Sequence, residues 1–334
     1  MSMASRMASV VAVLGVLVAT IAPAAEPLVV KIDGSSTVYP LSNAVAEEFR
    51  KKESSPVRIM VGISGTGGGF KKFCRGEIDI SDASRPILSH EMEICRAAGI
   101  EYLELPVAFD AITVVVNPRN TFLQHITAAE LQKLWEPAAQ GKIVTWRQIN
   151  PAWPDVRFKL YGPGGDSGTF DYFTDAIVGR VQSSRTDYVA SEDDNVLVQG
   201  VSHDANALGY FGYSYYAENA QKLKVVSIIE KAGGSAVTPS PETVSNGSYR
   251  PLSRPIFIYV NAKSIGRPEV KQFVDYYLQH AARLAKDVRT LPLPRSAYVQ
   301  AANNVKKMKL GTVFGGIAET GITIEELFRR EARN

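Results

Sequence analysis

The sequence predicts an α/β fold, and three observations support this class. Short runs rich in β-branched and aromatic residues alternate along the chain with segments of helical periodicity. No exact repeat and no low-complexity tract interrupts the alternation. In three places a predicted strand runs into a turn of small polar residues and then into a predicted helix. Helices packed on a largely parallel sheet are the architecture that such an alternation favours.

The individual elements follow from local patterns. Strands are expected at residues 28–33, 57–63, 102–108, 111–117, 157–162, 207–213, 224–229 and 256–261. Helices fit residues 40–52, 69–75, 89–98, 127–135, 169–179, 267–285, 295–309 and 323–332. Thr127 and Glu130 have the spacing of a capping box at the start of one of these helices. Residues 231–251 are rich in turn formers, and we expect an exposed loop there.

The N-terminal segment, residues 1–25, has the pattern of a secretory signal peptide. Arg6 supplies the positive charge, residues 10–21 are apolar but too short for a comfortable membrane span, and small residues follow at positions 22–24. A membrane anchor that stays attached is the alternative. The pattern predicts an exported protein.

Composition limits the possible partners. The 334-residue chain has a formal charge of +3, which becomes +2 without the single charge of Arg6. So balanced a charge does not predict nucleic-acid binding. About 310 residues remain after the signal peptide, enough for two domains. The two cysteines, Cys74 and Cys95, predict one disulfide in an exported protein, with two buried free thiols as the alternative. They have neither the number nor the spacing for a zinc site.

The three strand-to-helix turns share one chemistry. A helix N-terminus leaves its first N–H groups unpaired and carries partial positive charge. Glycine lets an anion approach the backbone, and hydroxyl groups add donors. If the strands are parallel, all three turns lie at their carboxyl ends, where α/β sheets bind ligands. Ordinary capping is the alternative at any one turn. We call them the first, second and third junctions; they lie in residues 32–49, 61–74 and 160–177.

Two other readings of these turns are weaker. A nucleotide-binding loop would close with Lys-Ser or Lys-Thr, and none of the junctions does so. The segment GDSG at residues 165–168 also occurs around the nucleophile of trypsin-like proteases, but none of the four histidines has a context that provides a base. We therefore expect no catalysis, no metal and no cofactor, with a secreted hydrolase as the less favoured alternative.

Asp82 and Arg85 extend the prediction of an anion site. Arg85 precedes Pro86 and could give a forked, permanently charged donor to an oxyanion, or form a surface salt bridge with a nearby aspartate. A carboxylate beside a bound anion is useful only if the ligand donates a proton to it. Phosphate and arsenate carry such a proton near neutral pH, whereas sulfate does not. Asp82 therefore predicts discrimination against sulfate, on the order of 10⁴ to 10⁵.

These motifs together resemble the PstS family, the periplasmic phosphate-binding proteins of ABC phosphate transporters. The stretches at residues 33–49, 62–73, 79–87, 126–151, 162–173 and 207–216 occur in the order of the family, and the resemblance covers nearly all of the mature chain. It implies a type II periplasmic binding protein fold, in which two lobes close on the ligand. Lobe one would comprise residues 26–110 and 255–334, and lobe two residues 111–254.

The resemblance also implies the ligand, the partners and the binding residues. The ligand would be inorganic phosphate and the partners the inner-membrane subunits of an ABC permease, with the binding protein itself a monomer. In some members an arginine precedes the third junction; here Pro163 stands in that stretch. Arg85 is the candidate replacement, and Arg185 is a second one. The implied phosphate-binding residues are Ser35, Ser36, Thr37, Ser64, Thr66, Gly67, Asp82, Ser167, Gly168 and Thr169.

Overall fold

The structure is a computed structural model that describes residues 28–52 and 57–333. The predicted signal peptide, residues 1–25, lies outside the described residues. Within the described ranges, no helix combines the length and the apolar character needed to cross a membrane.

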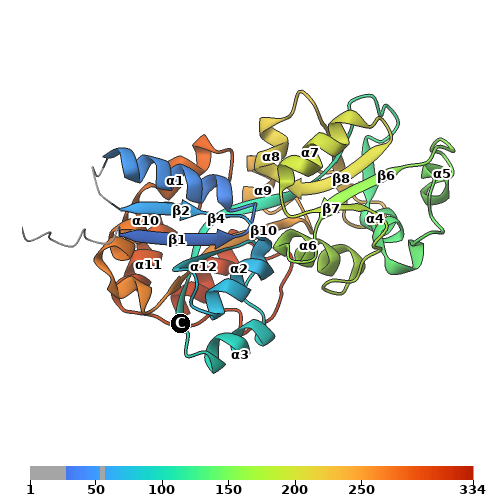
Figure 1. Ribbon diagram of the computed structural model, residues 1–334. Coiled ribbons are helices and arrows are strands. Elements are labelled where there is room, and N and C mark those ends of the chain that lie inside the picture. The colour runs from blue at the N-terminus through green and yellow to red at the C-terminus, as the bar shows by residue number, and fades with distance from the viewer. Residues whose placement is uncertain (1–27, 53–56, 334) are drawn as a thin grey trace, which may run out of the picture.

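One mixed sheet runs through the molecule, in the order β2-β1-β3-β10-β4-β8-β6-β7. The first half of this order contains the parallel strands β1 (Val29–Gly34), β2 (Arg58–Val61) and β3 (Ile80–Ala83). Strand β10 (Ser253–Asn261) is antiparallel to β3 and to β4 (Tyr102–Val116). The long strands β4 and β10 cross from one half of the molecule to the other (Figure 1).

The second half of the sheet is also built on parallel strands. They are β6 (Lys159–Pro163), β7 (Val189–Ser191) and β8 (Ala207–Gly212), and β8 is antiparallel to the second part of β4. Strand β9 (Lys224–Ile229) pairs with β4 and with the short strand β5 (His125–Thr127). Parallel order brings the carboxyl ends of the strands in each half to one edge.

Two groups of helices cover the two halves of the sheet (Figure 1). Around the first half lie α1 (Tyr39–Lys52), α2 (Gly65–Cys74), α3 (Ser89–Ala97), α10 (Pro268–Asp287), α11 (Arg295–Lys306) and α12 (Ile324–Arg333). Around the second half lie α4 (Ala128–Trp135), α5 (Trp146–Ile149), α6 (Gly168–Phe173), α7 (Asp194–His203) and α8 (Tyr213–Glu218). A π-helical turn, Thr174–Val178, continues α6, and the short helix α9 (Pro241–Ser245) lies within the expected loop at 231–251.

Strand β4 corrects the predicted strand pattern. The sequence predicts separate strands at 102–108 and 111–117, but residues 102–116 form one strand whose side chains are all buried. The charged residue between the two apolar runs, Asp110, lies opposite Arg254 in β10. An ion pair in the interior satisfies this carboxylate, so no turn is needed to bring it to solvent.

The start of α2 is a second correction. The expected helix begins at residue 69, whereas the observed one begins at Gly65 and includes the glycine run. Here glycine serves close packing: a Cβ added at Gly69 would lie 2.7 Å from the Cα atom of Gly34. Low helix propensity is outweighed by this contact between α2 and β1.

The predicted disulfide is confirmed, because Cys74 at the end of α2 is bonded to Cys95 in α3. The predicted capping box of α4 is also present, with Thr127 and Glu130 bonded to each other's backbone. The elements α5, α7, α8, β5 and β7 were not expected from the sequence.

Candidate functional site

The first and third junctions meet at the centre of the molecule. The first follows β1 and the third follows β6, so they come from opposite halves of the sheet. The hydroxyl oxygens of Thr37 and Thr169 are 3.1 Å apart, and both side chains are buried. Hydroxyl groups that are far apart in the sequence thus converge between the two halves.

The first junction is held by its own hydroxyl groups and by β3. The N–H of Ser35 donates to the carbonyl of Asp82 at 2.9 Å, and the Ser35 hydroxyl accepts from the N–H of Thr37 at 3.2 Å. Ser36 donates from its hydroxyl to Asp194, at the start of α7, at 3.3 Å. All three hydroxyl residues are almost completely buried.

In the second junction, Ser64 and Gly67 have partners that differ from the expected anion. The Ser64 hydroxyl donates to the carboxylate of Asp33 at 2.6 Å. The N–H of Gly67 donates to the carbonyl of Asp166, in the loop before α6, at 2.8 Å. These two residues therefore hold the second junction against β1 and against the opposite half.

Thr66 is the member of the second junction that faces the third. Its hydroxyl lies 3.2 Å from the hydroxyl of Ser84 and accepts from the Ser84 N–H at 3.1 Å. A Cβ added at Gly168 would lie 2.4 Å from the Thr66 hydroxyl oxygen, so only glycine permits this approach. Ser167 caps α6 by accepting from the N–H groups of Thr169 and Phe170 at 3.1 and 3.4 Å. Its own hydroxyl hydrogen remains available to a ligand.

Arg254, which sequence reasoning missed, joins the first and third junctions. Its Nη2 atom lies 3.2 Å from the Thr37 hydroxyl and 2.7 Å from the Thr169 hydroxyl, and its Nη1 atom donates to the Gly168 carbonyl at 3.0 Å. The Nε and Nη2 atoms also bond to Asp110, at 3.2 and 3.0 Å. The Arg254 side chain is completely buried. A fixed, permanently charged fork at this position suits a tetrahedral oxyanion.

Two signals in the sequence could have identified Arg254. The tetrad SRPI occurs twice, at residues 84–87 and 253–256, so the reasoning applied to Arg85 applies equally to the second copy. Arg254 is also a charged residue directly before an apolar strand pattern, and such a residue needs a partner when the strand is buried.

Arg85 and Arg185, the two arginines that the sequence suggested, lie elsewhere. Arg85 bonds to both carboxylate oxygens of Glu91 at 2.8 Å and to Asp171, in the opposite half, at 2.6 Å. Arg185 bonds to Asp187 and to two backbone carbonyls. The structure thus brings Arg254, and neither of these two, to the hydroxyls of the first and third junctions.

Asp82 and Asp194, which both bond to the first junction, each carry a buried carboxylate oxygen without a partner in the described part of the chain. Asp82 accepts from the Ser42 hydroxyl at 2.9 Å through Oδ1, while Oδ2 has no hydrogen-bond partner in the described part of the chain. Burial, reinforced by the charge of Asp33, raises the pKa of Asp82 well above its usual range. Asp194 likewise has an unpartnered Oδ1 within the described ranges, and burial raises its pKa to about 7. Both carboxyl groups are suited to share a proton with a ligand.

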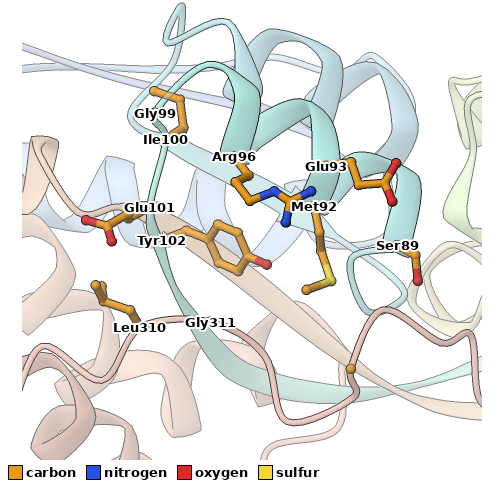
Figure 2. Close-up of a pocket in the computed structure, with 11 residues that line it drawn as sticks. Ser89, Met92, Glu93, Arg96, Gly99, Ile100, Glu101, Tyr102, Leu310 and Gly311 are labelled. Carbon is orange, nitrogen blue, oxygen red and sulfur yellow. The ribbon is translucent and has the colours of Figure 1, made fainter.

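One of the two cavities described here lies beside the junctions, and the other lies away from them. One of about 650 Å³ borders the second and third junctions and is lined by Gly67, Arg85, Asp166 and Asp171 among others. Another, of about 700 Å³, lies between α3 and the chain around Gly311; Met92, Arg96 and Tyr102 point into it (Figure 2). None of the residues implied to bind phosphate lines this second cavity. Among residues 28–52 and 57–333, no cluster of His, Cys, Asp or Glu could hold a metal ion.

Comparisons with known proteins agree with this architecture. A family model described as a PBP superfamily domain matches residues 21–280. Protein SphX of Synechococcus elongatus is 50% identical over 310 residues, covering 93% of this chain and 91% of SphX. The phosphate-binding protein PstS of Staphylococcus saprophyticus is 36% identical over 289 residues, covering 86% of this chain and 85% of its own.

A solved structure with a similar name also matches most of this chain. The crystal structure of a possible phosphate binding protein from Planctomyces limnophilus is 46% identical, with a TM-score of 0.62, and the match covers 84% of this chain and 98% of that one. The periplasmic-binding-protein fold expected from the resemblance is confirmed. The chain belongs to the PBP superfamily and, within it, to the family of the SphX and PstS proteins.

Proposed function

We propose that this protein binds inorganic phosphate between two lobes and delivers it to an ABC-type phosphate permease. The observation that carries the proposal is the position of Arg254, whose guanidinium lies within 3.2 Å of hydroxyl groups from both halves of the sheet. A buried cation surrounded by hydroxyl donors is complementary to a small oxyanion. Relatives named phosphate-binding protein PstS support phosphate as that anion.

The two lobes are residues 26–110 with 255–334, and residues 111–254, joined by β4 and β10. In the pairing pattern, β4 contacts β10 up to Ala111 and contacts β8 from Ile112 onward, which supports a division at this point. Hinge motion about β4 and β10 would separate the first junction from the third. A phosphate that contacts both junctions stabilises the closed form because it has these contacts only there.

The binding set combines hydroxyl groups, Arg254 and one proton acceptor. Ser36 and Thr37, with Ser35 beside them, belong to lobe one, as do Thr66 and Asp82. Ser167, Gly168 and Thr169 belong to lobe two. The unpartnered Oδ2 of Asp82 is the acceptor for the phosphate proton, and this choice selects against sulfate. Ser64, Gly67 and Arg85 act by holding the lobes in position, since their donors bond to carboxylates or to a backbone carbonyl and not to the hydroxyls at which the two lobes meet.

Membership of the family supports a proposal for where the protein works and with which partners. The protein is exported to the periplasm, works as a monomer and docks on permease subunits in the inner membrane. It performs no chemistry on phosphate. Other tetrahedral oxyanions, of which arsenate carries the required proton, are the second candidates as ligand.

Calorimetric titration of phosphate-stripped mature protein at about pH 7.5 tests the proposal. We expect one phosphate per chain with a Kd of about 1 µM or lower, and no heat from sulfate. Sulfate binding of similar strength would contradict the role of Asp82 but keep the anion site. If neither anion binds, phosphate capture is wrong.

A further inference from the structure

The carboxyl group of Asp194 is buried between the two halves and lacks a partner on one oxygen. Asp194 is the first residue of α7, follows strand β7 and is 1% exposed. Its Oδ2 accepts from the Ser36 hydroxyl at 3.3 Å, and Oδ1 has no hydrogen-bond partner among the residues described. A buried acceptor without a donor is unfavourable, so its position points to a ligand that donates a hydrogen bond.

The charged and titratable groups around Asp194 come from several elements. Asp110 faces it from β4, Arg254 from β10 and Tyr215 from α8, while Asp193 precedes it at the start of α7. Arg254 is the one cation in this set, and its fork is already bonded to Asp110. An ionised Asp194 would therefore be repelled by Asp110 and by any anion that binds to Arg254.

A proton removes this repulsion. Burial and, after it, the charge of Asp110 raise the pKa of Asp194 to about 7. A phosphate bound beside Ser36 and Arg254 adds further negative charge and shifts the pKa in the same direction. The Asp194 carboxyl group then donates a hydrogen bond through its own proton or accepts one from the ligand.

We propose that Asp194 is a second proton-sharing carboxyl group of the anion site, in addition to Asp82. This inference rests on the proposed binding of phosphate. In the complex, one proton lies between Asp194 Oδ1 and a phosphate oxygen, and another lies between the phosphate and Asp82 Oδ2. The additional proton comes from the solvent, and only O–H bonds are made or broken. The bound species is thus equivalent to monobasic phosphate facing an ionised Asp194.

Proton sharing by Asp194 makes phosphate binding weaker as the pH rises. In an open molecule Asp194 is exposed to water and titrates near the ordinary value of an aspartate, about 3.9. In the closed complex its pKa is higher, so binding takes up a proton when the pH lies between the two values. The Kd for phosphate therefore rises with pH, by up to about tenfold per unit.

Counting the protons taken up on binding tests this inference. Phosphate is titrated into the mature protein at about pH 7.0, below the raised pKa of Asp194 in the complex, in two phosphate-free buffers of different ionisation enthalpy. The dependence of the heat on the buffer gives the number of protons. We expect Asp194→Asn to take up about one proton fewer than the wild type, because the amide donates to phosphate without titrating. Asp193→Asn is the matched control and should keep the wild-type count, since asparagine also caps α7.

Each outcome decides the question. An equal proton count in Asp194→Asn and the wild type would overturn the inference and leave phosphate binding standing. If Asp194→Asn does not fold, the wild-type count decides after subtraction of the protons that phosphate itself exchanges: about one proton supports the inference, and none overturns it. Failure of the wild type to bind phosphate at any pH would instead overturn the proposed function.

Discussion

At the residue scale, Arg254 lies between a carboxylate that it neutralises and hydroxyls that it orients. The guanidinium donates to the Asp110 carboxylate, to the hydroxyls of Thr37 and Thr169 and to the Gly168 carbonyl. A lysine at this position keeps the charge but loses the planar fork, so it cannot bond to all of these groups at once. The planar geometry of the guanidinium, as well as its charge, is needed to bond to Asp110 and to the hydroxyls at the same time.

The substitution Arg254→Lys is expected to raise the Kd for phosphate at least tenfold, because one or more charge-assisted hydrogen bonds, worth about 1.5–3 kcal/mol each, are lost. Arg185→Lys is the matched control: Arg185 is equally buried but bonds to Asp187 and backbone carbonyls away from the junctions. It should lower the free energy of unfolding without changing the Kd. Calorimetry and urea titration measure the two quantities, and equal Kd changes in both variants would contradict the role of Arg254.

The role proposed for Asp82 is to select which anion is accepted. Asp82→Asn replaces the proton acceptor by a group that can donate, so sulfate binding should appear, and phosphate binding should weaken by about 1–3 kcal/mol. Asp79→Asn is the control, because Asp79 bonds to the Lys31 N–H and the Ser264 hydroxyl. Competition titrations with both anions measure the selectivity. A parallel loss of phosphate and sulfate affinity would show that Asp82 is structural.

Sequence reasoning at this scale found residue types more readily than partners. The hydroxyls and Asp82 were predicted because small polar residues after strands are a local pattern. The environments of Arg85 and Arg254 are set by residues far away in the chain, such as Asp171 and Asp110. The sequence around Arg85, which bonds to carboxylates, is the same tetrad as that around Arg254, which contacts hydroxyls. Local sequence therefore cannot distinguish the two environments.

At the scale of elements, the approach of α6 to α2 depends on the small residue at position 168. In Gly168→Ala the new Cβ would lie 2.4 Å from the Thr66 hydroxyl oxygen and 2.7 Å from that of Ser84. The two junctions would have to separate, and we expect phosphate affinity to fall at least tenfold, with a loss of about 1–3 kcal/mol from overpacking.

The control for this change lies three residues away in the same loop. No described atom lies within 4 Å of a Cβ added at Gly165, so Gly165→Ala should bind phosphate with unchanged affinity. Calorimetry on the two variants makes the comparison. Unchanged affinity in Gly168→Ala would show that closure does not need the close contact between α2 and α6.

Elements with strong periodicity were predicted well, and short ones were not. The strands at β1, β8 and β9 and the helices α3, α4 and α10 agree with the sequence to within a few residues. Helix α7 was not expected from the sequence, although Asp193 caps its N-terminus. It is the element that brings Asp194 to the site, and its position is set by packing against β8, β6 and β7, which are distant contacts that no local pattern reveals.

At the scale of the whole molecule, two ion pairs connect the halves of the sheet near the junctions. Arg85 and Asp171 are bonded at 2.6 Å with both side chains almost completely buried. Lys71 and Asp166 are bonded at the same distance, but their side chains are 61% and 44% exposed. Water and salt screen the exposed pair, so the buried pair should dominate the stability of the closed form.

We expect Asp171→Asn to weaken phosphate binding by about 1.5–3 kcal/mol, because a charge-assisted hydrogen bond of the closed form is lost. Lys71→Ala should change it by less than about 1 kcal/mol. Small-angle scattering with and without phosphate reports closure as a decrease in the radius of gyration. Equal effects of both substitutions on affinity would show that burial of the pair is irrelevant.

The register of β4 and β10 has a consequence for the release of the ligand. Arg254 and Asp110 lie directly opposite each other in this ladder, at the point where β4 changes its partner from β10 to β8. Both partners of this ion pair lie on the strands that join the halves, so the proposed hinge motion would leave the pair intact. The contacts that would break in the proposed opening are those between the halves, such as the hydroxyl contact of Thr37 with Thr169 and the ion pair of Arg85 with Asp171. The Asp110 carboxylate thus keeps its counter-ion during opening, and this buried charge does not add to the energy barrier of each round.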